Sequence, residues 1–263
     1  MALPDERAVA DYGIDAPGVI RGLTIGGVAG LAIGAVGFVV LGAGSSPVAL
    51  VVGAWGVFVG ITMIPTALLM YRSSKVGKLR ERDRLLDDLA LLGHEVVLDI
   101  GPGPGLLLIG AATRLQSGRA IGVDLWRPQD ESDNRPARTL ANARAEGVAD
   151  RVELINGDAQ ALPLPDDSVD VVVASLALHN IPSTEGRAKA IGEIHRVLRP
   201  GGRAAILDFQ ATAEYEHEFR AHGWTDVART ARRYDMFPPI RIVTGTKPLD
   251  LAHQAEAVAG QPR

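Results

Sequence analysis

The sequence predicts an α/β protein in which a doubly wound sheet is preceded by a two-helix transmembrane hairpin. Two observations predict it. No Asp, Glu, Lys or Arg occurs from Gly22 to Tyr71, a gap of 50 residues in a chain with 22% charged residues. Beyond about residue 79, short apolar runs alternate with segments of helical periodicity, which is typical of a sheet covered by helices.

The uncharged segment is long enough for two membrane spans, because one span needs roughly 20 apolar residues. We place the spans near 22–42 and 48–70, with a turn at 42–47 that is rich in Gly, Ser and Pro. A buried pair of soluble helices is the alternative, but each would then carry a polar face, and neither does. A cleaved signal peptide fits less well, because acidic residues outnumber basic ones in the first 21 residues.

Basic residues follow the second span: Arg72, Lys75, Lys78, Arg80, Arg82 and Arg84. By the positive-inside tendency this flank is cytoplasmic, so we expect a two-span protein of the cell membrane with both termini and the soluble domain in the cytoplasm. These side chains are also candidates to contact anionic lipid head groups.

Small residues recur at four-residue spacing within the spans, at Gly26, Gly30 and Gly34 and again at Gly56 and Gly60. Such spacing lets helix backbones approach closely in a membrane. Packing within the hairpin is one interpretation, and a homodimer through the hairpin is the other.

Composition excludes several classes of chemistry. The chain has no cysteine, which rules out disulfides, Cys-ligated zinc, iron–sulfur clusters and a thiol nucleophile. Its net charge of −4 argues against nucleic acid as a partner, because such binding relies on Lys and Arg side chains that neutralise phosphate charges. We predict no metal site.

The soluble portion is expected to alternate strands and helices. Strands are predicted at 95–100, 120–125, 151–155, 169–175, 203–209, 227–236 and 240–244, and helices at 85–92, 106–115, 138–146, 185–198 and 214–222. A short loop containing Pro238 and Pro239 joins the last two strands, so we expect them to form an antiparallel hairpin at one edge of the sheet.

The stretch Asp99–Gly105 carries the chemistry, with the pattern D-x-G-x-G-x-G at the end of the first predicted strand. Glycines at such a turn let a ligand approach the backbone. Dinucleotide-binding folds place a third small residue where this chain has Leu106. An acid just before the loop also suits a ligand with amino and sulfonium groups better than it suits a pyrophosphate.

On these residues the chain resembles the class I S-adenosylmethionine-dependent methyltransferases (methyltransferase type 11), and most of all the branch with the quinone and sterol C-methyltransferases. Four motifs match in order: Asp99–Gly105, Gly122–Asp124, Asn156–Ala159 continuing into Leu162–Asp170, and Arg196–Gly202. The resemblance implies a Rossmann-like, seven-stranded sheet whose last strand is antiparallel.

The resemblance also implies the cofactor S-adenosylmethionine and the residues around it. Asp124 would hold the ribose hydroxyls and Asp158 the adenine amino group, roles that suit carboxylate acceptors. Taken singly, either acid could instead be a helix cap or a loop carboxylate. The expected cofactor contacts are Asp99, Gly101, Gly103, Gly105, Asp124, Leu125, Asp158, Ala159 and Ser175.

The acceptor side is less determined. Family members present the residues after the fourth strand to the substrate, which makes His179 a candidate base, although it could equally be hydrogen-bonded within the fold. Tyr12 is a second candidate catalytic residue, because the hairpin returns its segment to the side of the soluble domain. Many methyl transfers need no strong base, since the sulfonium is already activated and placement supplies much of the rate.

These expectations divide the chain into a cytoplasmic N-terminal segment (1–21), the transmembrane hairpin (22–71), a basic juxtamembrane linker and helix (72–92), a methyltransferase domain (93–248) and a mobile tail (249–263). The main hypothesis is a membrane-anchored methyltransferase acting on a small-molecule or lipid-like acceptor. A non-catalytic S-adenosylmethionine-binding membrane sensor or scaffold, and a nicotinamide-dependent oxidoreductase, are the alternatives.

Overall fold

The computed structural model describes residues 9–41, 47–126 and 135–249. The predicted turn at 42–47, except Pro47, and the predicted tail beyond residue 249 lie outside these residues. The chain forms two compact units. One is helical and comprises residues 13–78 and 235–238; the other contains the sheet and comprises residues 1–12, 79–234 and 239–263.

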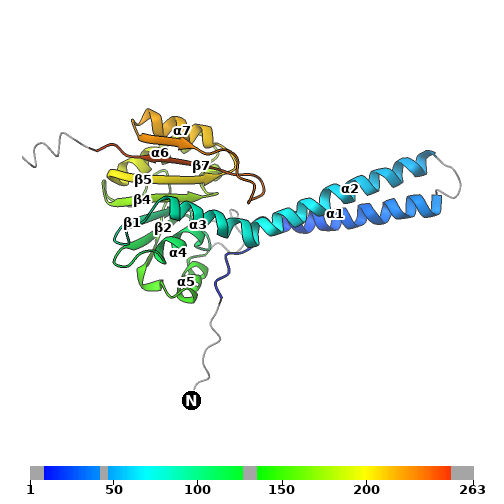
Figure 1. The fold of residues 1–263 in the computed structure, drawn as a ribbon, viewed down its shortest axis with the longest axis horizontal. Helices are drawn as coiled ribbons and strands as arrows, with labels where there is room; N and C mark the ends of the chain where they lie inside the picture. Colours follow the sequence, from blue (N-terminus) through cyan, green and yellow to red (C-terminus); the bar gives the residue numbers. More distant parts are fainter. Residues whose placement is uncertain (1–8, 42–46, 127–134, 250–263) are drawn as a thin grey trace, which may run out of the picture. The chain divides into compact units, whose positions relative to one another are not determined.

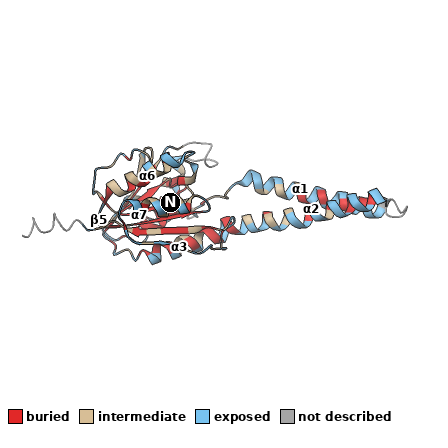
Figure 2. Ribbon diagram, turned by 90° about the horizontal axis from the view of Figure 1, so that it is seen from above, coloured by how far each residue is buried: buried red, intermediate tan, exposed pale blue. Residues whose placement is uncertain are grey.

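The helical unit is an antiparallel pair of apolar helices. Helix α1 (Pro17–Val36) begins with proline at its first position and continues into a π-helical turn at Gly37–Leu41. Helix α2 (Pro47–Arg72) is followed by a second π-helical segment, Ser73–Gly77. By length and composition alone, Pro17–Val39 and Pro47–Asp88 are candidate membrane spans. Figure 2 shows that most of both helices is exposed, and the exposed residues include many large apolar side chains.

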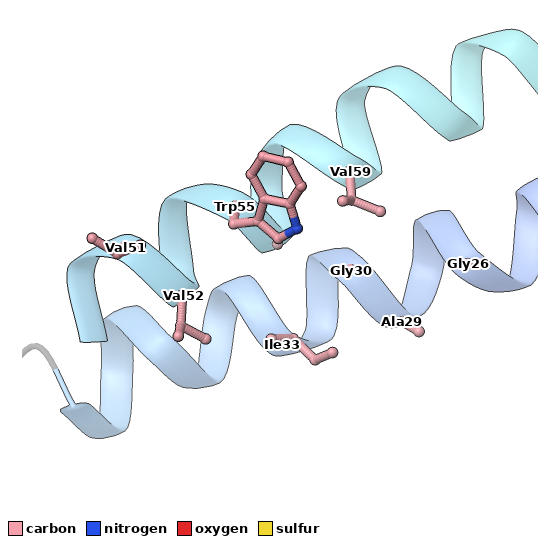
Figure 3. A pocket seen from close by; sticks show the side chains of 9 residues that line it. Gly26, Ala29, Gly30, Ile33, Val51, Val52, Trp55 and Val59 are labelled. Carbon is pink, nitrogen blue, oxygen red and sulfur yellow. The ribbon is translucent and has the colours of Figure 1, made fainter. Parts of the chain in front are cut away.

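Glycines form the contact between α1 and α2. A Cβ atom at Gly30 would lie 2.9 Å from the Gly56 carbonyl oxygen, and one at Gly56 would lie 2.5 Å from the Gly30 carbonyl oxygen. The glycine spacing therefore serves packing within the hairpin in this structure, as small residues do between membrane helices. Beside this contact an apolar groove of about 400 Å³ runs along the two helices, bordered by Trp55, Ile33 and Val59 (Figure 3).

A buried polar cluster closes the base of the helical unit. Lys78 Nζ forms an ion pair with Asp15 Oδ1 at 2.9 Å and donates to the Gly13 carbonyl oxygen at 3.1 Å. Ser74 Oγ accepts a hydrogen bond from the Asp15 backbone N–H at 3.0 Å. Lys78 is buried and its ammonium is paired with Asp15. It therefore does not project toward lipid head groups, the role for which the sequence made it a candidate.

The other unit contains a seven-stranded sheet in the order β3-β2-β1-β4-β5-β7-β6, covered by helices (Figure 1). The bounds are α3 (Lys78–Asp88), β1 (Val96–Ile100), α4 (Leu106–Ala112), β2 (Arg119–Asp124), α5 (Pro136–Ala145), β3 (Val152–Asn156), β4 (Val169–Ser175), α6 (Thr184–Val197), β5 (Leu198–Asp208), α7 (Thr212–Ala221), β6 (Thr225–Arg229) and β7 (Arg241–Thr246). Strand β7 runs antiparallel to both neighbours, while β1 to β5 are parallel. The predicted α/β class, the seven strands and the antiparallel last strand are confirmed.

Several predicted element boundaries are wrong: the helix expected at 85–92 spans Lys78–Asp88, and the strand expected at 203–209 spans Leu198–Asp208. The strand expected at 227–236 lies at Thr225–Arg229, because residues 235–238 leave the sheet and pack against Ser73–Gly77. In that packing Phe237 N–H donates to Ser73 Oγ at 2.9 Å. The helix expected to reach Leu198 ends at Val197, because Leu198 has extended backbone angles and pairs with Val169 in the sheet.

Successive side chains of a strand point to opposite faces of the sheet, so the sheet separates two cores. Leu98 and Ile100 of β1 belong to a buried cluster with α6 and α7. Asp99, between them, points to the other face, where its carboxylate bonds to α4. The chain order reverses between β1 and β4, and α/β proteins bind ligands at the carboxyl edge of the sheet at such a point.

Candidate functional site

A glycine loop connects β1 to α4 at this edge. Gly101, Gly103 and Gly105 all have positive φ angles, of 66°, 51° and 94°, which L-residues with side chains rarely adopt. A Cβ atom at Gly101 would lie 2.5 Å from the Cβ of Ala177, after β4. At Gly105 a Cβ atom would lie 2.7 Å from Ile109 Cδ1, so neither glycine could carry a side chain without displacing a neighbour.

Two buried side chains of α5 hold the loop. Thr139 Oγ1 donates to the Gly103 carbonyl oxygen at 2.6 Å, and Asn142 Nδ2 donates to the Pro104 carbonyl oxygen at 2.9 Å. Both residues are buried. The sequence analysis missed them, because a polar residue on a short helix carries no sign of which face it occupies.

Asp124 lies at the glycine loop, as the motifs predict. Its Oδ2 accepts a hydrogen bond from Gly103 N–H at 3.3 Å, and its Oδ1 accepts one from Trp126 N–H at 2.7 Å. Leu125, beside it, is partly exposed. The end of β2 and the end of β1 therefore bring an acid and the glycine turn together.

The remaining predicted cofactor residues follow β3 and β4. Asp158 comes two residues after Asn156, which pairs with Asp124 in the sheet, and its Oδ1 accepts from Gln160 N–H at 2.9 Å. Ala159 packs against the core cluster. Ser175 ends β4 and pairs with Leu207. All of these residues follow strands at the carboxyl edge, and their contacts with a cofactor stay predictions.

Asp99 is bonded to the first turn of α4, which follows the glycine loop. Its Oδ2 accepts a hydrogen bond from Leu108 N–H at 2.7 Å. Among the described residues, Oδ1 has no hydrogen-bond partner, although the side chain is buried. Burial raises the pKa of Asp99 well above its usual range, and the charge of Asp124 adds to the rise.

This raised pKa predicts a pH-dependent cost in stability. Between the ordinary carboxyl pKa of about 4 and the higher pKa of folded Asp99, the unfolded chain has released a proton that the folded chain retains. Stability contributed by this group therefore falls as pH rises, by up to about 1.4 kcal/mol per pH unit. We expect Asp99→Asn, which keeps the acceptor for Leu108 N–H, to gain stability relative to the unsubstituted chain between pH 5 and pH 8. Denaturant unfolding across that range measures it, and a pH-independent difference would contradict it.

His179 lies after β4, with Asp208 beside it at the end of β5. The His179 Nδ1 and Asp208 Oδ1 atoms are 2.9 Å apart but are not aligned as a hydrogen bond, an arrangement common in ligand-free sites. Asp208 is buried and accepts from the Tyr215 hydroxyl at 3.2 Å and from Phe209 N–H at 2.8 Å. Burial and the charge of Asp208 hold the pKa of Tyr215 far above its usual range, so the hydroxyl remains a donor.

Asp208 was not predicted from the sequence. A signal was present, since the apolar run before Asp208 is followed by an acid just as the runs before Asp99 and Asp124 are. Phe209, which follows, is 40% exposed, and its ring centroid lies 4.6 Å from that of His179. The imidazole therefore has a carboxylate on one side and an apolar aromatic surface on another.

Tyr12 is placed against α3 and α5. Its hydroxyl lies 3.5 Å from Glu146 Oε1, and the Arg82 guanidinium carbon lies 5.8 Å from its ring centroid. Burial, with the nearby Glu146 charge, raises the pKa of Tyr12 to about 12. These contacts belong to the attachment of the N-terminal segment, and a part for Tyr12 in the chemistry stays a prediction.

Comparison with known proteins agrees with this geometry. Residues 98–206 match the family described as a methyltransferase domain. The chain is 32% identical over 131 residues to the demethylmenaquinone methyltransferase of Thermus thermophilus, covering 50% of this chain and 54% of that protein. It is 39% identical over 130 residues to the 27-O-demethylrifamycin SV methyltransferase of Amycolatopsis mediterranei, covering 49% and 44%. The chain thus spans about half the length of the curated relatives it matches.

A solved structure extends the likeness to the fold. A SAM-dependent methyltransferase from Aquifex aeolicus superposes with a TM-score of 0.53 at 18% sequence identity, over 69% of this chain and 97% of that one. The seven-stranded sheet of this chain thus has the fold of a solved methyltransferase. Residues 98–206 match the methyltransferase domain family, and the predicted resemblance is confirmed for this segment.

Proposed function

We propose that the chain is a membrane-anchored S-adenosylmethionine-dependent methyltransferase that acts on an apolar small-molecule or lipid-like acceptor. One observation carries the proposal: the glycine loop with Asp124, and the His179–Asp208 pair, follow neighbouring parallel strands at the carboxyl edge of the sheet. A Cβ atom at Gly101 would lie 2.5 Å from the Cβ of Ala177, two residues before His179, so the loop and the segment with the candidate base lie side by side.

The residues around the loop fit the cofactor. Asp124 offers acceptors for a ribose diol, and the unpartnered Oδ1 of Asp99 can accept from a cationic amine. S-adenosylmethionine, when bound, supplies an electrophilic methyl group on a sulfonium. Asp158 and Ala159 belong to the motif after β3, which in the resembling family contacts the adenine.

His179 would orient the acceptor and accept the proton that it loses. Asp208 would orient the imidazole and face the positive charge that the ring gains, because its Oδ1 lies 2.9 Å from His179 Nδ1. Phe209 offers a flat apolar surface beside His179, suited to an aromatic or isoprenoid-bearing acceptor. The relatives named as quinone-pathway and rifamycin methyltransferases support such an acceptor by analogy.

The helical unit supports membrane anchoring. Its helices expose large apolar side chains such as Val51, Phe58 and Leu68, which soluble proteins rarely gather on one helix pair. A two-span hairpin with both termini on the cytoplasmic side, through which a homodimer could also form, follows from the charge pattern. Anchoring would place the site where bilayer-resident acceptors are concentrated.

Transfer of a labelled methyl group tests the acceptor. The purified full chain in detergent is incubated with labelled S-adenosylmethionine and either the membrane-lipid extract or the water-soluble small-molecule fraction of the producing cells. We expect label in a lipid-extractable product. Label only in the aqueous fraction would contradict a lipophilic acceptor. Binding of S-adenosylhomocysteine without turnover in either fraction would favour a sensor, and binding of NAD in its place would favour an oxidoreductase.

A further inference from the structure

A short N-terminal segment, residues 9–12, lies against α5 within the sheet-containing unit. One side chain binds its backbone in both directions. Asn142 Oδ1 accepts from Asp11 N–H at 3.0 Å, and Asn142 Nδ2 donates to the Asp11 carbonyl oxygen, also at 3.0 Å. A single amide thus pairs with Asp11 much as a neighbouring strand would.

The same amide group holds the glycine loop. The second hydrogen of Asn142 Nδ2 serves the Pro104 carbonyl oxygen at 2.9 Å, so its two donors are divided between the segment and the loop. Asn142 is 6% exposed, so water cannot readily replace a lost partner. Thr139, one turn earlier on α5, bonds to the loop at Gly103.

Tyr12 fastens the segment to the domain. Its side chain is 8% exposed, with its ring under Arg82 and its hydroxyl toward Glu146. Removing this aromatic ring would take away the largest apolar contact that residues 9–12 make. It would thereby weaken the attachment of Asp11, which Arg138 of α5 also contacts, to Asn142.

We propose that Asn142 is a positioning residue that couples the docked N-terminal segment to the glycine loop, so that docking of residues 9–12 raises the affinity for S-adenosylmethionine. Without Asp11 the amide loses two of its three partners and can rotate away from Pro104, which lies between two cofactor-cradling glycines. Tyr12 is followed at once by the residues leading to α1, so cofactor binding is linked to the chain segment that enters the hairpin. The inference rests on the proposed cofactor site.

A double-mutant cycle tests the coupling, with S-adenosylhomocysteine affinity measured by calorimetry on the full chain in detergent. We expect Tyr12→Ala to weaken binding about fivefold, the effect of one lost buried hydrogen bond at the loop. In an Asn142→Ala background the same substitution should change affinity by less than about twofold, because the coupling group is already absent. Thr139→Val is the matched control: it removes a loop bond from α5, and Tyr12→Ala should keep its fivefold effect there.

Equal effects of Tyr12→Ala in the Asn142→Ala and unsubstituted backgrounds would overturn the inference. Asn142→Asp serves if the alanine variant does not fold, because it keeps the side-chain size and the acceptor for Asp11 N–H but cannot donate to either carbonyl. Amide exchange at Gly101, Gly103 and Gly105 should be faster in Tyr12→Ala. If the segment only stabilised the fold as a whole, exchange at these glycines would not change while global stability stayed the same. If the unsubstituted chain does not bind S-adenosylhomocysteine, the proposed cofactor site fails instead.

Discussion

Asp124→Ala is expected to weaken the binding of S-adenosylhomocysteine about 100-fold, the loss of two hydrogen bonds to a charged acceptor. The substitution removes the acceptor proposed for the ribose diol. It also removes the partner of Gly103 N–H, so the glycine loop loses a contact that positions it. Calorimetry on the full chain in detergent measures the change.

Asp150→Ala is the matched control for this prediction. Asp150 is exposed and precedes β3, at the opposite strand end from the glycine loop, and its ion pair with Arg151 is long at 3.7 Å. Its removal should leave the affinity unchanged. An Asp124→Ala variant that is folded and binds as tightly as the control would exclude Asp124 from the cofactor site.

His179→Gln is expected to lower kcat for methyl transfer between about 100-fold and 1,000-fold, as loss of a general base does, while affinity for S-adenosylhomocysteine changes by less than about twofold. Glutamine keeps the polar character and approximate size but cannot accept a proton from the acceptor. Asp208→Asn should lower kcat by a smaller factor, because it weakens stabilisation of the imidazolium without removing the base.

The readout is methyl incorporation into the lipid-extractable product, and His217→Gln is the control because His217 is exposed on α7. A full rate in His179→Gln would show that the acceptor needs no base and that His179 only packs within the fold. A loss of cofactor affinity equal to the loss of rate would place His179 in binding instead.

Much of the fold could be predicted because the signals are local. The strands ending at Asp99 and Asp124 are apolar runs closed by an acid, and the uncharged segment from Gly22 to Tyr71 needs only composition. Less predictable was the region after Arg229, where residues 235–238 leave the sheet to pack on Ser73–Gly77. That contact joins positions more than 150 residues apart, and no local pattern encodes it.

The candidate site divides in the same way. Asp99, the three glycines and Asp124 follow from motif spacing, because neighbouring parallel strands end at one edge of the sheet. Asp208 and Asn142 do not follow from spacing. Each acts through a partner that lies elsewhere in the chain, His179 for Asp208 and the N-terminal segment for Asn142.

The sequence by itself determined the class of fold, the methyltransferase motifs and the two apolar helices, since periodicity, glycine spacing and absence of charge are properties of neighbouring residues. Only the tertiary structure decided that Asp208 faces His179, that Lys78 is buried against Asp15 and that one amide joins Asp11 to Pro104. The physical reason is that a buried polar group must find its partner in space, and the partner's distance along the chain leaves no trace in the local pattern.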